Sequence, residues 1–252
     1  METDNADSEP LPTLRVGPSP GHEHTHTAIF LHGRGGNIAH FHESLQYTRD
    51  SRERTLADAF PSFRWVFPQA PRRQWFDVWN VRDFSDNEEL QLAGLREVVP
   101  QIRDLLAREA ARLGGRWDRV VLMCISMGSA TSVHTLFNLD VPTPERRLGA
   151  FVGFSGRCPF AGRSLDEMRR LLGLEACPAH GDVLVNTPMM LQHCVDDPLV
   201  KIDWGRRQCE VLRSFGATVT WCEYPDGLHW MNSPEGTDHV VEFLTDVLQL
   251  GE

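Results

Sequence analysis

The sequence predicts an α/β fold with a mostly parallel central sheet and helices on both of its faces. From residue 27 onwards, short apolar runs alternate with longer amphipathic stretches. The apolar runs are nearly continuous, as expected of strands that are covered on both faces. Strands separated by helices are joined by right-handed crossovers, which give a mostly parallel sheet. The chain of 252 residues suits one large domain better than two small ones.

Residues 1–24 differ in composition from the rest of the chain. They hold four prolines and many acids, so we expect a flexible N-terminal tail before a folded domain over 25–252. They resemble neither a secretory signal nor an Arg-rich transit peptide. No run approaches the roughly 18 apolar residues that a membrane span needs. We therefore expect a cytoplasmic protein without integral membrane association.

Six apolar runs predict the strands of the sheet. They cover residues 28–32, 64–68, 119–126, 149–155, 188–193 and 217–224. Four stretches with a helical period lie between or after them, at residues 88–112, 127–138, 199–215 and 237–248. Ser85 and Glu88 suggest a capping box at the start of the first helix. Pro100 should kink this helix, and Gly114 should end it.

The segment 156–182 fits the alternation of strands and helices poorly. It holds a Cys-Pro pair, a short helical piece over 165–172 and a further proline. A surface excursion of this length between two core strands is often a lid. We therefore expect 156–182 to be a lid-like insertion. Arg157 and Arg163 on it could meet an anionic substrate, although a solvated lid face is the favoured interpretation.

Charge and residue usage exclude several functions. The net charge of −10, from 25 basic and 35 acidic residues, provides no basic surface for nucleic acid.

The six cysteines are scattered and are interpreted as reduced thiols. No zinc-ligand spacing is present. His22, His24 and His26 alternate along an extended segment and could hold a metal, although a solvated approach to the first strand is the favoured interpretation. We expect no metal and no cofactor.

A serine stands at the junction of a strand and a helix. The apolar run VVLMCI leads directly into Ser126, and the following residues begin a helix. Such a turn lifts a nucleophilic hydroxyl above the sheet and directs helix amides toward a forming oxyanion. The alternative is a buried serine at an ordinary junction. Cys124 occupies the position of the first glycine in G-x-S-x-G, and we interpret it as a packing residue.

A glycine-rich loop follows the first predicted core strand, in FLHGRGGN at 30–37. The strand–serine–helix turn described above is called a nucleophile elbow. In folds that contain it, the loop after this strand supplies one amide of the oxyanion hole, and the residue after the nucleophile supplies the other. These amides belong to Arg34 and Met127. A phosphate-binding loop is the alternative, but the glycine and lysine spacings that define such loops are missing.

An acidic pair and a histidine follow the last two predicted strands. Asp196 and Asp197 lie at the carboxyl end of a buried strand, where sites form in α/β proteins. His229 lies on the loop after the last strand. Serine, aspartate and histidine in this chain order are typical of α/β-hydrolases. The predicted catalytic residues are therefore Ser126, His229 and one of the two aspartates.

The chain resembles the phospholipase/carboxylesterase branch of the α/β-hydrolases, which includes the acyl-protein thioesterases. The resemblance covers nearly everything from 27 to 248. It rests on FLHGRGG, FPQAPRR, WFDVW, ISMG, DDPLV and YPDGLHW. It implies an eight-stranded sheet, often with the first antiparallel strand reduced, and no cofactor. It assigns the catalytic aspartate to Asp197. Cys124 in the elbow and Gly36, where thioesterases commonly carry aspartate, depart from the pattern.

The resemblance implies a serine hydrolase that cleaves an ester or thioester of a small molecule or an acylated protein. WFDVWN and the HGRG loop look more like fungal relatives, some of which act on secondary metabolites. One alternative is therefore a pathway enzyme for a particular ester, lactone or carrier-bound thioester, and another is an inactive ligand-binding protein. Trp75, Phe76, Trp79 and Trp230 are candidates for the apolar wall of the substrate site. The sequence is compatible with a homodimer but does not define the oligomeric state.

Overall fold

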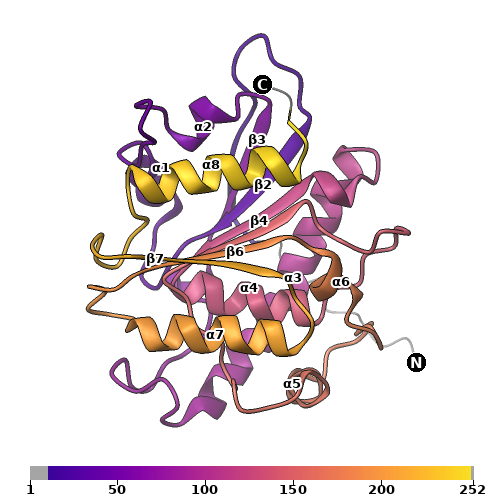
Figure 1. The fold of residues 1–252 in the computed structure, drawn as a ribbon. Coiled ribbons are helices and arrows are strands. Elements are labelled where there is room, and N and C mark those ends of the chain that lie inside the picture. The colour runs from indigo at the N-terminus through magenta and orange to yellow at the C-terminus, as the bar shows by residue number, and fades with distance from the viewer. Residues whose placement is uncertain (1–10, 251–252) are drawn as a thin grey trace.

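The computed structural model describes residues 11–250, which form an α/β sandwich around one central sheet (Figure 1). Seven strands of the described residues follow the order β1-β3-β2-β4-β5-β6-β7. All neighbouring pairs are parallel except β1 and β3. The strands are β1 Thr13–Val16, β2 His26–Leu31, β3 Phe63–Pro68, β4 Val120–Ile125, β5 Ala150–Phe154, β6 Met189–Cys194 and β7 Val219–Tyr224. The six predicted strands are therefore present, with ends shifted by one or two residues.

The hydrophobic pattern did not predict the antiparallel edge strand β1, although the family resemblance implied a reduced antiparallel first strand. It pairs with β3 from Thr13 opposite Pro68 to Val16 opposite Trp65. Part of the segment expected to be a flexible tail therefore belongs to the sheet, and that expectation is wrong for 13–16. A run of four residues between prolines is too short to show a clear alternation. Residues 1–10 of the predicted tail lie outside the described part of the chain.

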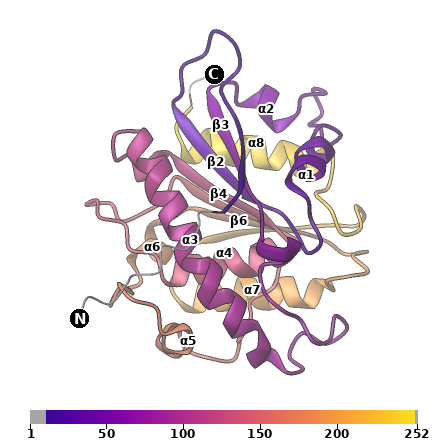
Figure 2. The same ribbon diagram turned by 180° about the vertical axis from the view of Figure 1, so that it is seen from behind.

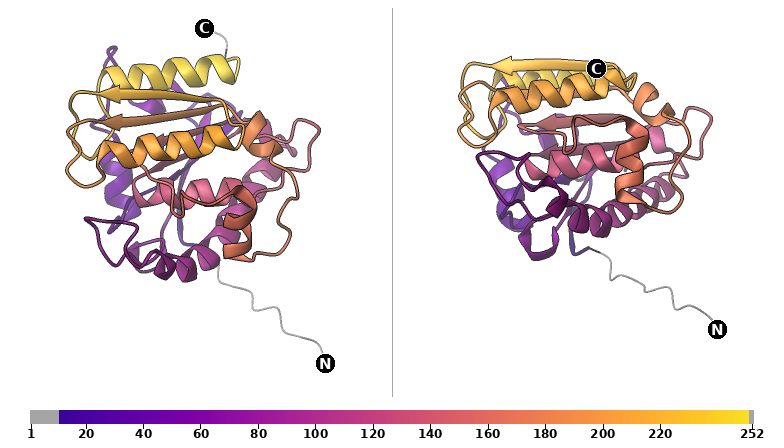
Figure 3. Two further views of the ribbon diagram at one scale, coloured as in Figure 1. Left: turned by 60° about the horizontal axis from the view of Figure 1, so that its bottom comes forward. Right: turned by 90° about the horizontal axis from the view of Figure 1, so that it is seen from below.

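Helices cover both faces of the sheet (Figures 1 and 3). One face carries α1 Ile38–Leu45, α2 Leu56–Ala59 and α8 Glu235–Val247. The other carries α3 Gln91–Arg112, α4 Met127–Phe137, α5 Leu165–Leu172, α6 Asp182–Asn186 and α7 Ile202–Ser214. None of the helices within 11–250 is long and apolar enough to cross a membrane.

Strand β4 shows why the apolar runs are continuous. Leu122 and Cys124 pack into the core beneath α3 and α4, whereas Met123 and Ile125 pack into the core beneath α8. Successive side chains of a strand point to opposite faces, so a strand between two helical layers needs apolar residues at every position. The centre of the sheet is therefore rigid at the point where the chain leaves β4.

Two helix starts differ from the prediction. A 3₁₀ turn at Glu88–Leu90 precedes α3, and Ser85 Oγ donates to Asp83 Oδ1 at 2.6 Å, so the expected capping box is not formed. The α3 helix continues through Pro100. Helix α7 begins at Ile202, three residues later than predicted from the start at 199. The amides that precede it donate to a carboxylate of the site described below.

The segment 156–182 is not a cover over the site. Helix α5 lies beside α3 (Figure 2). Arg96 and Arg103 of α3 donate to the carbonyls of Leu171 at 2.7 Å and Glu175 at 3.1 Å. Of the whole segment, only Arg157 lines the pocket at the carboxyl ends of the strands. The expected lid is instead the crossover connection that carries the chain from β5 back to β6.

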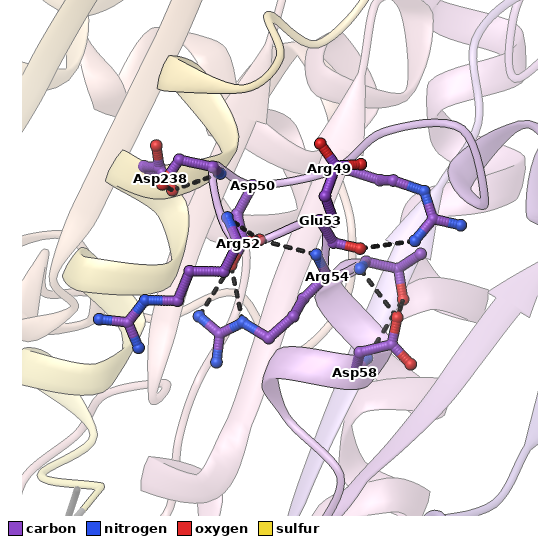
Figure 4. A network of polar contacts seen from close by, with 9 residues as sticks. Arg49, Asp50, Arg52, Glu53, Arg54, Asp58 and Asp238 are labelled. Carbon is purple, nitrogen blue, oxygen red and sulfur yellow. Dashed lines mark hydrogen bonds and ion pairs between the residues drawn. The ribbon is translucent and has the colours of Figure 1, made fainter.

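A polar network fixes the loop between α1 and α2 against α8 (Figure 4). The buried Asp50 carboxylate accepts from the amides of Arg52 and Arg54 and pairs with the Arg54 guanidinium at 2.7 Å. The Ser51 amide donates to Asp238 of α8 at 2.9 Å. This loop is therefore attached to a helix that is almost two hundred residues away in sequence.

Candidate active site

Ser126 lies on a sharp turn between β4 and α4. Its backbone has φ 58° and ψ −122°, which is unusual for a residue with a side chain. Its amide donates to Phe154 O at 2.9 Å, so the turn is fixed to the neighbouring strand. A Cβ atom at Gly128 would lie 2.6 Å from the carbonyl oxygens of Leu31 and His32. The glycine therefore allows α4 to begin directly against the end of β2.

Cys124 lies beneath this turn. Its side chain is fully buried in the core, and Sγ is 3.5 Å from Val152 O. Burial raises the pKa of the Cys124 thiol to about 12, so the side chain is a neutral thiol at neutral pH. These surroundings agree with the interpretation of Cys124 as a packing residue.

Asp197 and His229 form a close pair. His229 Nδ1 lies 2.7 Å from Asp197 Oδ2, while the other carboxylate oxygen accepts from the amides of Leu199 and Val200 at 2.8 and 2.9 Å. These two bonds explain why α7 starts late. Asp196 instead accepts from the Leu228 amide at 2.8 Å. The expected contact of His229 with Asp197 is thus present, and Asp196 fixes the backbone of the histidine loop.

A second histidine, which the sequence analysis did not identify, lies against the same carboxylate. His193 Nε2 donates to Val200 O at 2.7 Å and is 3.4 Å from Asp197 Oδ2. A Cβ atom at Gly205 would lie 2.3 Å from His193 Nδ1, so this glycine makes room for the ring. Burial would raise the pKa of the Asp197 carboxyl, but the hydrogen bonds from His193, His229 and the Val200 amide outweigh it and hold that pKa well below its usual value.

The glycine-rich loop after β2 is organised around His32. This buried ring donates from Nδ1 to Gly33 O at 2.6 Å and accepts at Nε2 from the Ala70 amide at 3.1 Å. Trp75 Nε1 donates to His32 O at 2.8 Å. A Cβ atom at Gly33 would lie 3.2 Å from Ser126 Cβ, so the loop passes directly beside the serine. Burial lowers the pKa of His32, which keeps the ring neutral for this pair of bonds.

A pocket of about 840 Å³ lies at the carboxyl ends of the strands, and its lining includes the predicted catalytic residues Ser126 and His229 but not Asp197. Ser126, His229, Arg34 and Met127 all line it. Within the described residues, no hydrogen bond joins the Ser126 hydroxyl to the His229 ring. The apolar part of the wall consists of Phe41, Val78, Val81, Phe84, Ile125, Pro198, Leu199, Val200 and Trp230.

Three of the four residues expected to form that wall do not line the pocket. Trp75 and Phe76 are buried, and their positions support the glycine loop and the start of α3, respectively. Trp79 is 68% exposed and lies outside the pocket lining. Only Trp230 contributes to the wall, held by a hydrogen bond from Nε1 to Thr48 Oγ1 at 2.9 Å. The expected wall is therefore wrong for Trp75, Phe76 and Trp79.

Arg157 is not on a solvated face as expected. Only 4% of this residue is exposed, and it contributes to the pocket wall beside Phe84. Arg163 is exposed and lies outside the pocket lining. Arg157 lies only three residues after the end of β5 at Phe154, so it stays beside the carboxyl ends of the strands, where the pocket lies.

The histidines that alternate before the first core strand have other partners where the structure describes them. His24 Nε2 lies 2.8 Å from Thr27 Oγ1, and His26 stacks on Phe63 with its Nδ1 2.9 Å from Thr25 Oγ1. Within residues 11–250, no group of three or more His, Cys, Asp or Glu side chains could hold a metal ion.

A sheet of this order, a serine on a strained strand–helix turn and an aspartate–histidine pair on the loops after β6 and β7 define an α/β-hydrolase. The chain belongs to the phospholipase/carboxylesterase family, whose sequence profile matches residues 16–248. It is a serine hydrolase that acts on esters or thioesters.

Curated relatives and solved structures agree with this family. The acyl-protein thioesterase 1 of Yarrowia lipolytica is 24% identical over 91% of this chain and 94% of its own length. That of Cryptococcus neoformans is 26% identical over 77% of this chain and 75% of its own length. The crystal structure of Zea mays acyl-protein thioesterase 2 covers 94% of this chain and 99% of its own, with 23% identity and a TM-score of 0.70. That of esterase PE8 covers the same shares, with 19% identity and a TM-score of 0.71.

Proposed function

We propose that Ser126, His229 and Asp197 form a catalytic triad that cleaves a carboxylic ester or thioester through an acyl-enzyme. The observation that carries this proposal is that the strained serine turn and His229 line one pocket, and that the His229 ring is paired with Asp197 at 2.7 Å. The Asp197 carboxylate fixes the proton of His229 on Nδ1, which leaves Nε2 as a base for the serine hydroxyl. The contact between serine and histidine often tightens only when substrate is bound.

In this mechanism, Ser126 Oγ attacks the carbonyl carbon while His229 removes its proton. The amides of Arg34 and Met127 donate to the oxyanion of the tetrahedral intermediate, each contributing about 3 kcal/mol to catalysis. His229 then returns the proton to the departing alcohol or thiol. Water activated by the same histidine releases the acid from the serine.

The relatives named as acyl-protein thioesterases suggest an acylated protein as one substrate, and the pocket also suits an ester or thioester of a small molecule. The proposed reaction uses no metal and no cofactor. A cytoplasmic location remains a prediction from the sequence, which is compatible with a homodimer but does not define the oligomeric state.

The test is labelling with a fluorophosphonate together with turnover of a simple ester. Ser126→Ala should remain folded, take up no label and lose nearly all activity. Ser44→Ala is the matched control, because Ser44 is a second serine in the pocket wall and should not be needed for the reaction. Labelling of Ser126→Ala at the wild-type rate would show that another residue is the nucleophile.

A further inference from the structure

The charged side chains of the pocket are all of one sign. Its wall includes four arginines but no aspartate or glutamate, in a chain whose net charge is −10. Arg34, Arg73 and Arg82 are exposed, and Arg157 is buried. Within residues 11–250, none of the four lies within 4.0 Å of a carboxylate oxygen. The pocket is therefore a cationic space in an acidic protein.

Arg157 has few partners for a buried cation. Its guanidinium lies over the Phe84 ring at 4.4 Å and near the Phe76 ring at 5.5 Å. Nη2 donates to the neutral Gln91 side chain at 2.8 Å, and the buried Nη1 has no hydrogen-bond partner among the described residues. Buried charges in proteins are normally paired, so this arrangement lacks an acceptor.

The acid closest to supplying that acceptor is already engaged. Glu88 accepts from the Phe160 amide at 2.7 Å, and it forms no ion pair with Arg157. Burial raises the pKa of Glu88, while the bond from the Phe160 amide and the charge of Arg157 act in the opposite direction. Burial also lowers the pKa of Arg157, but only to about 10, so the guanidinium is charged at neutral pH.

We propose that the pocket selects substrates whose acyl group carries a carboxylate, and that Arg157 is the specificity-determining residue that pairs with it. This inference rests on the proposed hydrolysis at Ser126. The apolar side chains of Val81 and Phe84 suit the methylene chain between the scissile carbonyl and the carboxylate. We assign Arg157 to the acyl side because it is buried, whereas the leaving group has to depart toward solvent.

The first experiment uses the unaltered protein and three esters of the same length. These are ethyl hydrogen adipate, with a carboxylate on the acyl group; ethyl hexanoate, without one; and the hexanoyl ester of glycolate, with the anion on the leaving group. We expect kcat/KM for the adipate ester to exceed that for ethyl hexanoate at least tenfold. A preference for ethyl hexanoate, or for the glycolate ester over the adipate ester, would overturn the proposal.

The second experiment replaces the cation and keeps the apolar stem. Arg157→Met should lower kcat/KM for the adipate ester at least about thirtyfold, as expected when one partner of a buried charge pair is removed. Its kcat/KM for ethyl hexanoate should change less than threefold. Arg163→Met, which removes an exposed arginine outside the pocket, should change neither. An equal loss on both esters would show that Arg157 only supports the fold.

The two proposals fail in different ways. A protein that is labelled at Ser126 and cleaves ethyl hexanoate, but does not favour the adipate ester, retains the proposed function and loses the inference. If Arg157→Met does not fold, inhibition of the wild type decides the matter. Adipate should then inhibit hydrolysis at least tenfold more strongly than hexanoate, and equal inhibition would overturn the inference.

Discussion

The Asp197 carboxylate is surrounded by polar groups from three parts of the chain. Two backbone amides, His229 and the nearby His193 surround it, and only 5% of the residue is exposed. Because these donors hold the pKa of Asp197 far below its usual value, the carboxylate stays ionised when His229 accepts a proton. The same bonds join the strand end of β6, the start of α7 and the loop after β7.

Asp197→Asn should preserve the fold and nearly abolish catalysis. An asparagine amide can donate to His229 Nδ1, which places the ring proton on Nε2 and removes the base. We expect kcat to fall about 10⁴-fold, as for the equivalent change in other triads. Steady-state kinetics on a simple ester measures this effect.

Asp196→Asn is the matched control. The asparagine oxygen can still accept from the Leu228 amide, so kcat should stay within threefold of the wild type. A larger loss in Asp196→Asn than in Asp197→Asn would reverse the assignment of the catalytic acid.

At the scale of elements, the conformation of the loop after β2 depends on the His32 ring at its centre. A Cβ atom at Gly36 would lie 2.2 Å from His32 Nδ1 and 3.0 Å from Gly33 O. As long as His32 keeps its place, this position cannot hold any side chain. That includes the aspartate that is common in thioesterases. This gives a structural reason for the departure from that pattern.

Gly36→Ala should displace the loop that carries the proposed oxyanion amide of Arg34. A misplacement of about 1 Å costs on the order of 10²-fold in rate, so we expect kcat/KM to fall ten- to a hundredfold. Gly162→Ala, at a site with no atom within 4 Å of the added carbon, should leave the rate unchanged. Unaltered kinetics in Gly36→Ala would mean that the loop does not contribute to the oxyanion site.

The core strands and the positions of the proposed catalytic residues were predictable because they depend on local patterns. Strand β4 is apolar throughout, and Ser126 directly follows it. The pocket wall was not predictable in the same way. Val78, Val81 and Phe84 lie in a stretch without periodicity. The burial of Arg157 requires Phe76 and Phe84, from the connection between β3 and α3, to pack against a residue that is distant in sequence.

At the scale of the molecule, the loop between α1 and α2 contributes to the stability of the fold and also contacts the wall of the pocket. Its Thr48 accepts from Trp230 in the pocket wall, and Asp50 fixes its fold. Burial alone would raise the pKa of Asp50, but bonds from the Arg54 amide and guanidinium and from the Arg52 amide lower it. A lowered folded-state pKa means that the ionised Asp50 stabilises the protein above the unfolded-state pKa, and that this stabilisation is lost as pH falls through the folded-state pKa.

Asp50→Asn should lower the free energy of unfolding at pH 7 by about 2 kcal/mol, because it places a neutral amide against the Arg54 guanidinium. The difference from the wild type should shrink as the pH falls below about 4. Urea denaturation at both pH values measures it. Asp104→Asn, at an exposed position of α3, should change the free energy by less than about 0.5 kcal/mol at either pH. An Asp50→Asn effect that grows toward acid would contradict this sign.

The proposed catalytic residues and the wall of the pocket come from different parts of the chain. Ser126, Asp197 and His229 follow adjacent or nearly adjacent strands, β4, β6 and β7, whose positions the sheet fixes. Val78, Val81 and Phe84 come from the long connection between β3 and α3. Loops tolerate insertion, deletion and replacement far better than packed strands. Changes in that connection during evolution can therefore alter which substrate fits the pocket, while the residues proposed to carry out the reaction stay the same.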